Sequence, residues 1–261
     1  MEEDTPFKIA EISLKRVKVA PEHQKSVFEN NTVSRAISEC AIRYIHQNNS
    51  KKTLGLGCGN GTMENAYPFF GVEYSAGSDI DEVSVDYAKK NAELNGVADK
   101  TDFRCGDMYE PFRGTRFQIG IHDASSVAQP VAALTPWYPE GKYSGGDEGI
   151  ETSKKAIECI DDLLEKDGVF ILGRVSLANE REIAALAKAK HGSRVIDIQD
   201  KYFPKRILFN ECLYDPKELE KGRKVPHPVI RELKRKGTIF YEEIRGRLFW
   251  YLHMQIITAR T

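Results

Sequence analysis

Apolar and polar residues along the central part of the chain follow two periods, one typical of strands and one typical of helices. Short apolar runs predict strands at 54–56, 72–80, 101–105, 117–121, 169–172 and 194–198. Apolar positions three or four residues apart predict helices at 33–48, 63–70, 82–95, 152–166 and 180–190. Strand and helix therefore alternate at least five times. This order predicts βαβ units and an α/β fold, with a mostly parallel sheet that carries helices on both faces.

The two ends of the chain depart from this pattern. Residues 1–30 have mixed periodicity, and we interpret them as an N-terminal appendage to one domain over 31–261. From Arg247 a long β-prone run predicts a last strand at the edge of the sheet, with residues 202–208 as its partner.

Basic residues gather just before this last strand. Residues 215–247 hold ten Lys and Arg against six Asp and Glu, and prolines at 226 and 228 interrupt any single helix. We interpret 211–246 as a basic insertion. It either recruits an anionic partner such as RNA or a phosphorylated molecule, or is simply a solvated helical face.

Composition limits the classes of function. The 38 Lys and Arg nearly balance the 39 Asp and Glu, so no overall field attracts nucleic acid or a membrane. No apolar run reaches the roughly 18 residues that cross a bilayer, and residues 1–6 lack the features of a secretory signal. Five widely spaced cysteines without a C-x-x-C pair argue against a disulfide framework or a zinc site. We therefore expect a cytoplasmic protein without a metal.

A glycine-rich turn, Thr53-Leu-Gly-Leu-Gly-Cys-Gly-Asn-Gly-Thr62, links the first strand to a helix. Glycines are required where backbone curls tightly against a ligand, and the helix start offers unpaired N–H groups. No register fits the dinucleotide fingerprint, which has glycines at relative positions one, three and six. The pattern L-G-x-G-x-G instead resembles the first motif of class I S-adenosylmethionine (SAM) methyltransferases, the alternative being an ordinary glycine-rich loop. The resemblance implies that Gly55, Gly57, Cys58 and Gly59 lie against the cofactor.

Acidic residues stand at the ends of the next two strands, where parallel sheets bind their ligands. Asp79, 18 residues after Gly61, is suited to accept hydrogen bonds from both ribose hydroxyls, although Asp81 or Glu82 could compete. Ile80 would then lie against the adenine. At the third strand, Asp107 is suited to receive the adenine amino group and Met108 to pack on the ring, unless Asp107 is a helix cap or loop carboxylate.

Further segments extend the resemblance. The runs L-G-L-G-C-G-N-G, G-S-D-I-D, A-K-K-N-A-E-L-N-G and C-G-D-M follow the order of class I SAM methyltransferases, and G-G-D-E-G-I-E at 145–151 is similar to a segment of the protein-glutamine N-methyltransferases of release factors. The resemblance covers about 30–210 and implies a Rossmann-like, mostly parallel seven-stranded sheet with SAM as cofactor. One departure is Gly55, where that family has Asp or Glu to hold the methionine end of SAM.

The acceptor motif also departs from the family. Where the glutamine methyltransferases have Asn-Pro-Pro-Tyr after the fourth strand, this chain has Asp123-Ala-Ser-Ser126, which argues against glutamine or adenine N6 as acceptor. Asp123 is a candidate contact for a hydroxyl or amine. His122 is a candidate base, since its ordinary pKa suits neutral pH, but a histidine on a central strand is often a core residue. Trp137, Tyr138 and Tyr143 form either an apolar lid or an ordinary packed loop.

Three functions remain open at this level. The first is SAM-dependent methyl transfer to a hydroxyl, carboxylate or amine of a small molecule. The second is transfer to a protein or RNA, favoured by the G-G-D-E-G-I-E segment and the basic insertion. The third is a SAM-binding interaction domain without catalysis, which Gly55 and the lost Asn-Pro-Pro-Tyr motif keep open.

Overall fold

The computed structural model describes residues 17–20, 32–138 and 145–260, so the appendage expected at 1–30 lies almost entirely outside it. The chain forms two compact units. The first unit comprises the N-terminal part as far as Ala124, with Glu158–Leu172 and the chain end from Ile256. The second comprises Ser125–Ile157 and Gly173–Gln255. A single domain over 31–261 stays a prediction.

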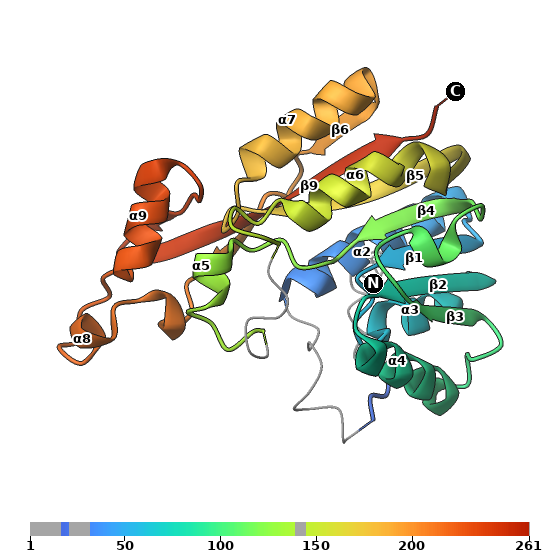
Figure 1. Cartoon of the computed structure of the whole chain (residues 1–261), viewed down its shortest axis with the longest axis horizontal. Helices are drawn as coiled ribbons and strands as arrows, with labels where there is room; N and C mark the ends of the chain where they lie inside the picture. The colour runs from blue at the N-terminus through green and yellow to red at the C-terminus, as the bar shows by residue number, and fades with distance from the viewer. Residues whose placement is uncertain (1–16, 21–31, 139–144, 261) are drawn as a thin grey trace, which may run out of the picture. The chain divides into compact units, whose positions relative to one another are not determined.

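The first unit contains the parallel sheet that the alternating pattern predicts (Figure 1). Its strands are ordered β3-β2-β1-β4-β5 and each pairs in parallel with its neighbour. Their bounds are β1 Lys52–Leu56, β2 Tyr74–Asp79, β3 Thr101–Cys105, β4 Phe117–His122 and β5 Leu164–Val175, which runs on into the second unit. The helices before and between them are α2 Thr32–Asn48, α3 Thr62–Ala66 and α4 Glu82–Asn95, and a 3₁₀ turn, Glu110–Phe112, follows β3.

Strand β1 lies at the centre of this sheet. Leu54 and Leu56 on one face and Thr53 on the other are all inaccessible to solvent, so both faces of the strand are covered. Helix α4 begins at the predicted residue because the Asp81 carboxylate accepts a hydrogen bond from the Ser84 N–H. It ends at Gly96, whose φ of 67° is the left-handed conformation of a C-cap.

The helix after the glycine loop is short, as predicted. Helix α3 stops at Ala66 and continues as a 3₁₀ turn, Tyr67–Phe70, with Pro68 near its start. Proline has no N–H to donate to the preceding turn and cannot extend an α-helix. The short helix places Glu64, Asn65 and Tyr67 in the interior of the first unit.

The second unit is organised around β9, Arg247–Thr258, whose last residues belong to the first unit. β7, Lys205–Leu208, and β8, Glu242–Ile244, pair with it in antiparallel fashion, which confirms the partner predicted at 202–208. The other elements are α5 Gln129–Ala132, α6 Glu151–Leu163 (which runs into the first unit), α7 Glu180–His191, β6 Val195–Ile198, α8 Pro216–Leu219, α9 Pro228–Lys236 and two 3₁₀ turns, Gly192–Arg194 and Glu211–Leu213.

Two expectations about the sheet are wrong in detail. The described sheet has nine strands rather than seven, because the short β7 and β8 add to it. β9 is not an edge strand, since the order is β5-β9-β6. The consecutive residues Trp250, Tyr251 and Leu252 are all buried, which requires cover on both faces of β9. The α/β class, with a mostly parallel core sheet, is confirmed.

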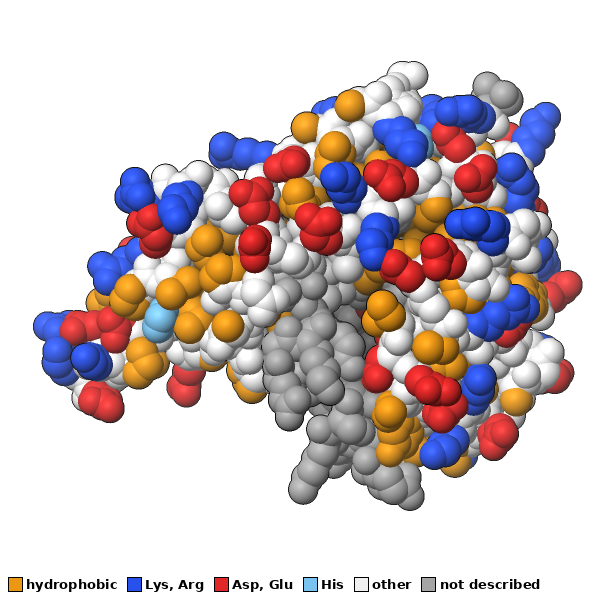
Figure 2. Space-filling model, in the orientation of Figure 1, with side chains coloured by type: hydrophobic (Ala, Val, Ile, Leu, Met, Phe, Trp, Pro, Cys, Tyr) orange, Lys and Arg blue, Asp and Glu red, His pale blue; other side chains and the backbone are white. Residues whose placement is uncertain are grey.

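The segment 211–246 carries much of its charge in local pairs. Lys221 and Arg223 both pair with Glu218. On α9, Arg235 and Lys236 pair with Glu232 at 2.7 and 3.6 Å. Over α8 and α9, Figure 2 shows basic side chains next to acidic ones. These pairs favour the solvated-face interpretation of this segment, and its role as an insertion that recruits a partner stays a prediction.

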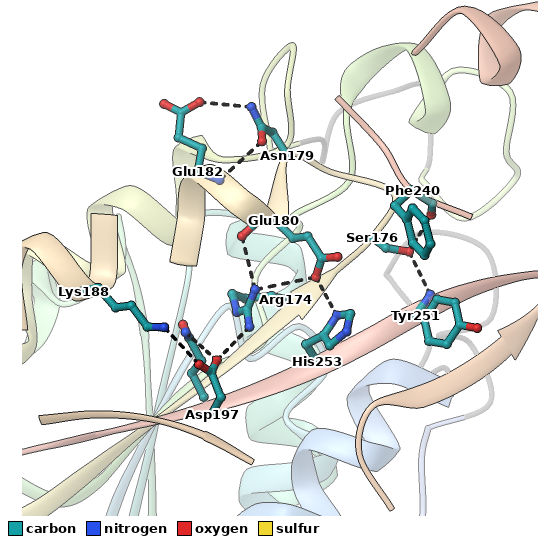
Figure 3. Close-up of polar contacts among 11 residues, drawn as sticks. Arg174, Ser176, Asn179, Glu180, Glu182, Lys188, Asp197, Phe240, Tyr251 and His253 are labelled. Atoms are coloured by element: carbon teal, nitrogen blue, oxygen red, sulfur yellow. Dashed lines mark hydrogen bonds and ion pairs between the residues drawn. The ribbon is translucent and has the colours of Figure 1, made fainter. Parts of the chain in front are cut away.

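An ionic network around the buried Arg174 joins four elements of the second unit (Figure 3). Arg174 on β5 is 8% exposed and lies 3.0 Å from the Asp197 carboxylate of β6 and 3.6 Å from that of Glu180 on α7. Glu180 in turn lies 2.6 Å from His253 Nδ1, and Gln255 donates a 2.8 Å hydrogen bond to Asp197. The buried guanidinium therefore lies between two carboxylates, of which Glu180 is 12% and Asp197 34% exposed.

We expect Arg174→Met to lower the free energy of unfolding by about 1–3 kcal/mol, because the largely buried Glu180 would lose its guanidinium partner, whereas the more exposed Asp197 would keep Lys188. Urea denaturation measures the change. The matched control is Lys188→Met, which removes a side chain that is 59% exposed and pairs with the same Asp197. Lys188→Met should lower the free energy of unfolding by less than about 1 kcal/mol. Equal losses for the two variants would contradict the central position of Arg174.

Candidate functional site

The glycine loop after β1 curls over the end of β2. Gly57, Gly59 and Gly61 have φ values of 80°, 52° and 68°, which other residues rarely adopt. The N–H groups of Gly57 and Cys58 both donate to the Ser78 carbonyl at 2.9 Å. A Cβ on Gly61 would collide with Ala88 and Phe103, so this glycine also allows close packing against α4 and β3. The loop backbone is therefore held against the carboxyl edge of the sheet.

Asp79 at the end of β2 fastens this loop. One carboxylate oxygen accepts a 2.9 Å hydrogen bond from the Gly59 N–H, and the other accepts a 3.0 Å bond from the Asp81 N–H. Burial raises the pKa of Asp79, and these N–H groups oppose the rise. Each oxygen keeps a further lone pair for a ligand. The competitor Asp81 is engaged as the cap of α4, and Glu82 is an exposed residue of its first turn.

The tip of β3 lies beside the tip of β2. The Gly106 N–H donates a 2.9 Å hydrogen bond to the Asp79 carbonyl, which brings Asp107 and Met108 to the same edge of the sheet. Both side chains are half-buried, and Met108 has a φ of 49°. Ile80 is 67% exposed although it is apolar. The structure thus brings together the residues predicted to surround an adenosyl group.

The structure limits the contacts that two predicted cofactor-binding residues, Cys58 and Gly55, can make with a ligand. The Cys58 side chain packs into the apolar cluster of Val85, Ala88 and Phe103, so only its backbone faces the loop. Burial raises the pKa of its thiol well above the ordinary value. Gly55 is buried within β1, and a Cβ built on it would overlap Oε1 of Glu64. Any contact of Gly55 with a ligand is therefore limited by the Glu64 side chain.

Glu64 is a site residue that the sequence did not reveal. Its side chain is inaccessible to solvent, and no other described residue gives either oxygen a hydrogen bond. Burial is the main cause that raises the pKa of its carboxyl from the ordinary 4.5 to about 8; its own backbone N–H opposes this rise, and the charges of Asp123 and Asp79 contribute to it. The sequence shows only a glutamate in the first turn of a helix, which is common on surfaces. Its one signal is the missing side chain at Gly55.

Asp123 follows β4 and is anchored by its backbone, since its N–H donates to the Leu56 carbonyl at 3.1 Å. Burial raises the pKa of its carboxyl to about 7, and a hydrogen bond from Ser34 opposes the rise. Its neighbour His122 is 1% exposed and lies within the core of β4. The partly exposed Asp123 is therefore the better placed of the two to meet an acceptor.

The predicted aromatic lid belongs to the second unit. Trp137 lies against Trp250 of β9 with ring centroids 6.2 Å apart, and Tyr138 is buried. This packing favours the interpretation as an ordinary packed loop. Tyr143 lies outside the described residues. Gly149 of the G-G-D-E-G-I-E segment is also in close contact, with Ala178 and Ala128, so this segment contributes to packing.

Glu64, Asp79 and Asp123 make this edge of the sheet acidic. The charges that act most strongly on Glu64 are those of the other two carboxylates. A ligand that carries positive charge and hydroxyl groups would relieve the repulsion and donate hydrogen bonds to the available carboxylate lone pairs. Among the described residues, no group of three or more His, Cys, Asp or Glu side chains could hold a metal ion. No helix in the described ranges could cross a membrane.

Comparison with known proteins places the chain near SAM-dependent methyltransferases. Residues 36–135 match the family described as ribosomal protein L11 methyltransferase (PrmA). The chain is 32% identical over 129 residues to the ribosomal protein L11 methyltransferase of Caldanaerobacter subterraneus subsp. tengcongensis, covering 45% of this chain and 40% of that protein. It is 28% identical over 133 residues to a Methanocaldococcus jannaschii protein named, provisionally, as a protein N5-glutamine methyltransferase, covering 51% of this chain and 66% of that protein.

A solved structure shows the same fold over more of the chain. The ribosomal protein L11 methylase of Lactobacillus delbrueckii subsp. bulgaricus superposes with a TM-score of 0.53 at 13% identity, covering 94% of this chain and 86% of that one. This superposition confirms the Rossmann-like fold, and the family and sequence matches confirm the resemblance to this class of methyltransferases. The chain spans only 31–66% of the length of the first three curated relatives, and the family match over residues 36–135 includes the glycine loop.

We expect Asp79→Ala to loosen the glycine loop, because the Gly59 N–H loses its acceptor. Hydrogen exchange of the amides at 57–61 should become faster by roughly tenfold or more, equivalent to about 1–2 kcal/mol. Asp86→Ala, an exposed change on α4, is the control. Unchanged protection in Asp79→Ala would show that this carboxylate does not hold the loop.

The pKa of Glu64 also predicts the pH dependence of stability. A carboxyl whose folded-state pKa lies near 8 binds its proton more tightly in the folded than in the unfolded chain, so stability falls as pH rises from about 5 to 8. Removing this group with Glu64→Gln should reduce the slope by up to about 1.4 kcal/mol per pH unit. Urea denaturation between pH 5 and 9 measures it, and parallel curves for the two proteins would contradict a buried, titrating Glu64.

Proposed function

We propose that this chain is a SAM-dependent methyltransferase whose cofactor lies at the carboxyl edge of β1–β4 in the first unit. The observation that supports this most strongly is the convergence of the glycine loop with the carboxylates of Asp79, Asp123 and Glu64. A loop backbone with three left-handed glycines gives a ligand close approach. The acidic surroundings favour a cation, and SAM carries both a sulfonium and an ammonium charge.

The residues fit the parts of SAM one by one. Asp79 keeps a lone pair on each oxygen for the two ribose hydroxyls while it holds Gly59 and Asp81. Ile80 and Met108 offer apolar surface for the adenine, and Asp107 an acceptor for its amino group. Cys58 contributes only backbone, since its side chain packs toward α4. Gly57 and Gly59 leave room for the ligand above the loop.

When bound, SAM supplies a methyl group on a positively charged sulfur. The lone pair of the acceptor attacks the methyl carbon in line with its bond to sulfur, and that bond breaks. Asp123 follows the strand next to β1 and is partly exposed, so its carboxylate can orient the acceptor. With a pKa of about 7, it is half ionised at neutral pH and can accept a proton. His122 is buried in β4, and we assign it a packing role.

An amine is the acceptor that suits these groups best. A protonated amine is attracted by the same carboxylates, and its lone pair becomes available once a base such as Asp123 takes the proton. An aliphatic hydroxyl holds its proton far more tightly than a carboxyl of pKa 7 can remove it. A carboxylate acceptor would be repelled by Glu64, Asp79 and Asp123. We therefore narrow the predicted acceptor to a nitrogen.

The amine belongs to a small molecule in our first proposal. A protein side chain is the second candidate, because two relatives that match about half of this chain are named for protein substrates. RNA is the least favoured carrier, since several of the basic side chains in 211–246 are paired with Glu218 and Glu232. A SAM-binding domain without catalysis predicts binding and no transfer.

SAM labelled in its methyl group identifies whether the acceptor nitrogen belongs to a small molecule, a protein or an RNA. When the purified chain is incubated with labelled SAM and an extract of the source organism, we expect the label to be transferred from SAM to another molecule. Acid-soluble product identifies a small acceptor, protease-sensitive precipitate a protein and ribonuclease-sensitive precipitate an RNA. SAM that binds without any transfer in these fractions would contradict the enzymatic function and leave the interaction domain.

Asp123→Asn tests the proposed base. We expect the variant to transfer methyl at least about 100-fold more slowly, since the amide cannot take the proton. The wild-type rate should rise between pH 6 and 8 as the carboxyl ionises, while the residual rate of Asp123→Asn stays flat. Label transfer in the same extract measures both. A variant as fast as the wild type would remove Asp123 from the reaction.

A further inference from the structure

Of the three acidic residues of the site, only Glu64 has not been matched to a particular group of the cofactor or the acceptor. Glu64 is inaccessible to solvent, and no other described residue gives its oxygens a hydrogen bond. A buried carboxylate without donors from other residues is unfavourable, because it loses its hydration and gains little in return. Buried polar groups in folded proteins are nearly always satisfied. A ligand with hydrogen-bond donors would satisfy this one.

The backbone of α3 holds Glu64 in this position. The Ser75 hydroxyl of β2 donates a 2.9 Å hydrogen bond to the Glu64 carbonyl. The following residue, Asn65, donates its N–H to the Gly61 carbonyl at 2.8 Å and its side-chain amide to the Ala88 carbonyl at 3.2 Å. Glu64 and Asn65 thus fix the backbone of α3 to β2, to the glycine loop and to α4, which sets the point from which the Glu64 side chain extends.

The carboxylate lies beside the tip of β1. A Cβ on Gly55 would overlap Oε1 of Glu64, so the glutamate occupies the space that a side chain at position 55 would fill. The next residue in the strand, Leu56, accepts the Asp123 N–H at its carbonyl. The charges of Asp123 and Asp79 both act on Glu64. Glu64 therefore lies beside the tip of β1, within electrostatic reach of these two residues.

The chemistry of SAM indicates which part meets Glu64. The ribose hydroxyls are assigned to Asp79 and the adenine to the tip of β3. The sulfonium carries charge but no N–H group. Only the α-ammonium group of the methionine end combines positive charge with several N–H donors. We propose, on the basis of the proposed function, that Glu64 binds this ammonium group.

Gly55 and Glu64 then form a matched pair. The helix supplies a carboxylate to the space beside β1 because the strand supplies none. Any side chain at 55 would displace the glutamate, since its Cβ overlaps Oε1. The φ of Gly55 lies outside the left-handed region, so a side chain there is compatible with the backbone. The pair predicts that the carboxylate can be moved from one residue to the other.

Calorimetric titration at pH 8 tests the assignment with three ligands. SAM and S-adenosylhomocysteine both carry the α-ammonium group, whereas 5′-methylthioadenosine lacks the amino-acid end. Glu64→Gln should weaken binding of the first two by roughly 10- to 100-fold and leave the third within about threefold of wild type. Circular dichroism confirms that the variant is folded. Glu93→Gln, exposed on α4, should change none of the three affinities.

The outcomes separate this proposal from the proposed function. If the wild-type chain binds none of the three ligands, the proposed function fails. If the wild type binds them and Glu64→Gln either keeps all three affinities or loses all three alike, only the role of Glu64 is overturned.

A second pair of variants keeps the test independent of the glutamine substitution. Glu64→Ala should lose affinity for SAM as Glu64→Gln does. Gly55→Asp combined with Glu64→Ala should recover it to within about tenfold of wild type, because the new carboxylate enters the vacated space. Gly55→Ala alone should weaken SAM binding by displacing Glu64. A double variant no better than Glu64→Ala would contradict the assignment.

Discussion

The hydrogen bonds between the glycine loop and the end of β2 are the interaction on which the site depends. The loop reverses direction within a few residues, and the N–H groups that it exposes are taken up by the Ser78 carbonyl and the Asp79 carboxylate. This arrangement fixes the start of α3 and hence the position of Glu64. It also leaves the carboxyl ends of β1, β2 and β4 next to one another, as their parallel pairing requires.

Burial of Glu64 lowers the stability of the folded chain but favours binding of a cation. The folded chain without a ligand holds carboxyl groups with pKa values near 7 and 8, which at neutral pH remain partly protonated. Each ionisation is unfavourable until a cation arrives. Active sites commonly hold such destabilised groups, because the same charges that lower stability bind the substrate. The ionic network around Arg174 represents the opposite case, in which buried charges already have their partners.

Much of the fold could be predicted from the sequence, and less of the site. Helix α4 has its predicted bounds, since Asp81 and Gly96 cap it by local interactions. The position of β9 inside the sheet could not be predicted, because strand order depends on long-range pairing. Asp79 and Asp107 could be placed at one edge from strand order alone. Glu64 could not, because its burial depends on how α3 packs under β1, and the packing of Trp137 against Trp250 is likewise a tertiary contact.

The central claim is that an acidic site at the tips of β1, β2 and β4 binds the cationic SAM molecule. Titration of the wild-type chain with SAM at pH 7, in two buffers of different ionisation enthalpy, counts the protons released on binding. The bound cation should lower the pKa values of Glu64 and Asp123, so these groups should release protons when SAM binds. Binding of S-adenosylhomocysteine, which carries less positive charge, should release fewer protons. Absence of SAM binding, or binding without proton release, would contradict this account.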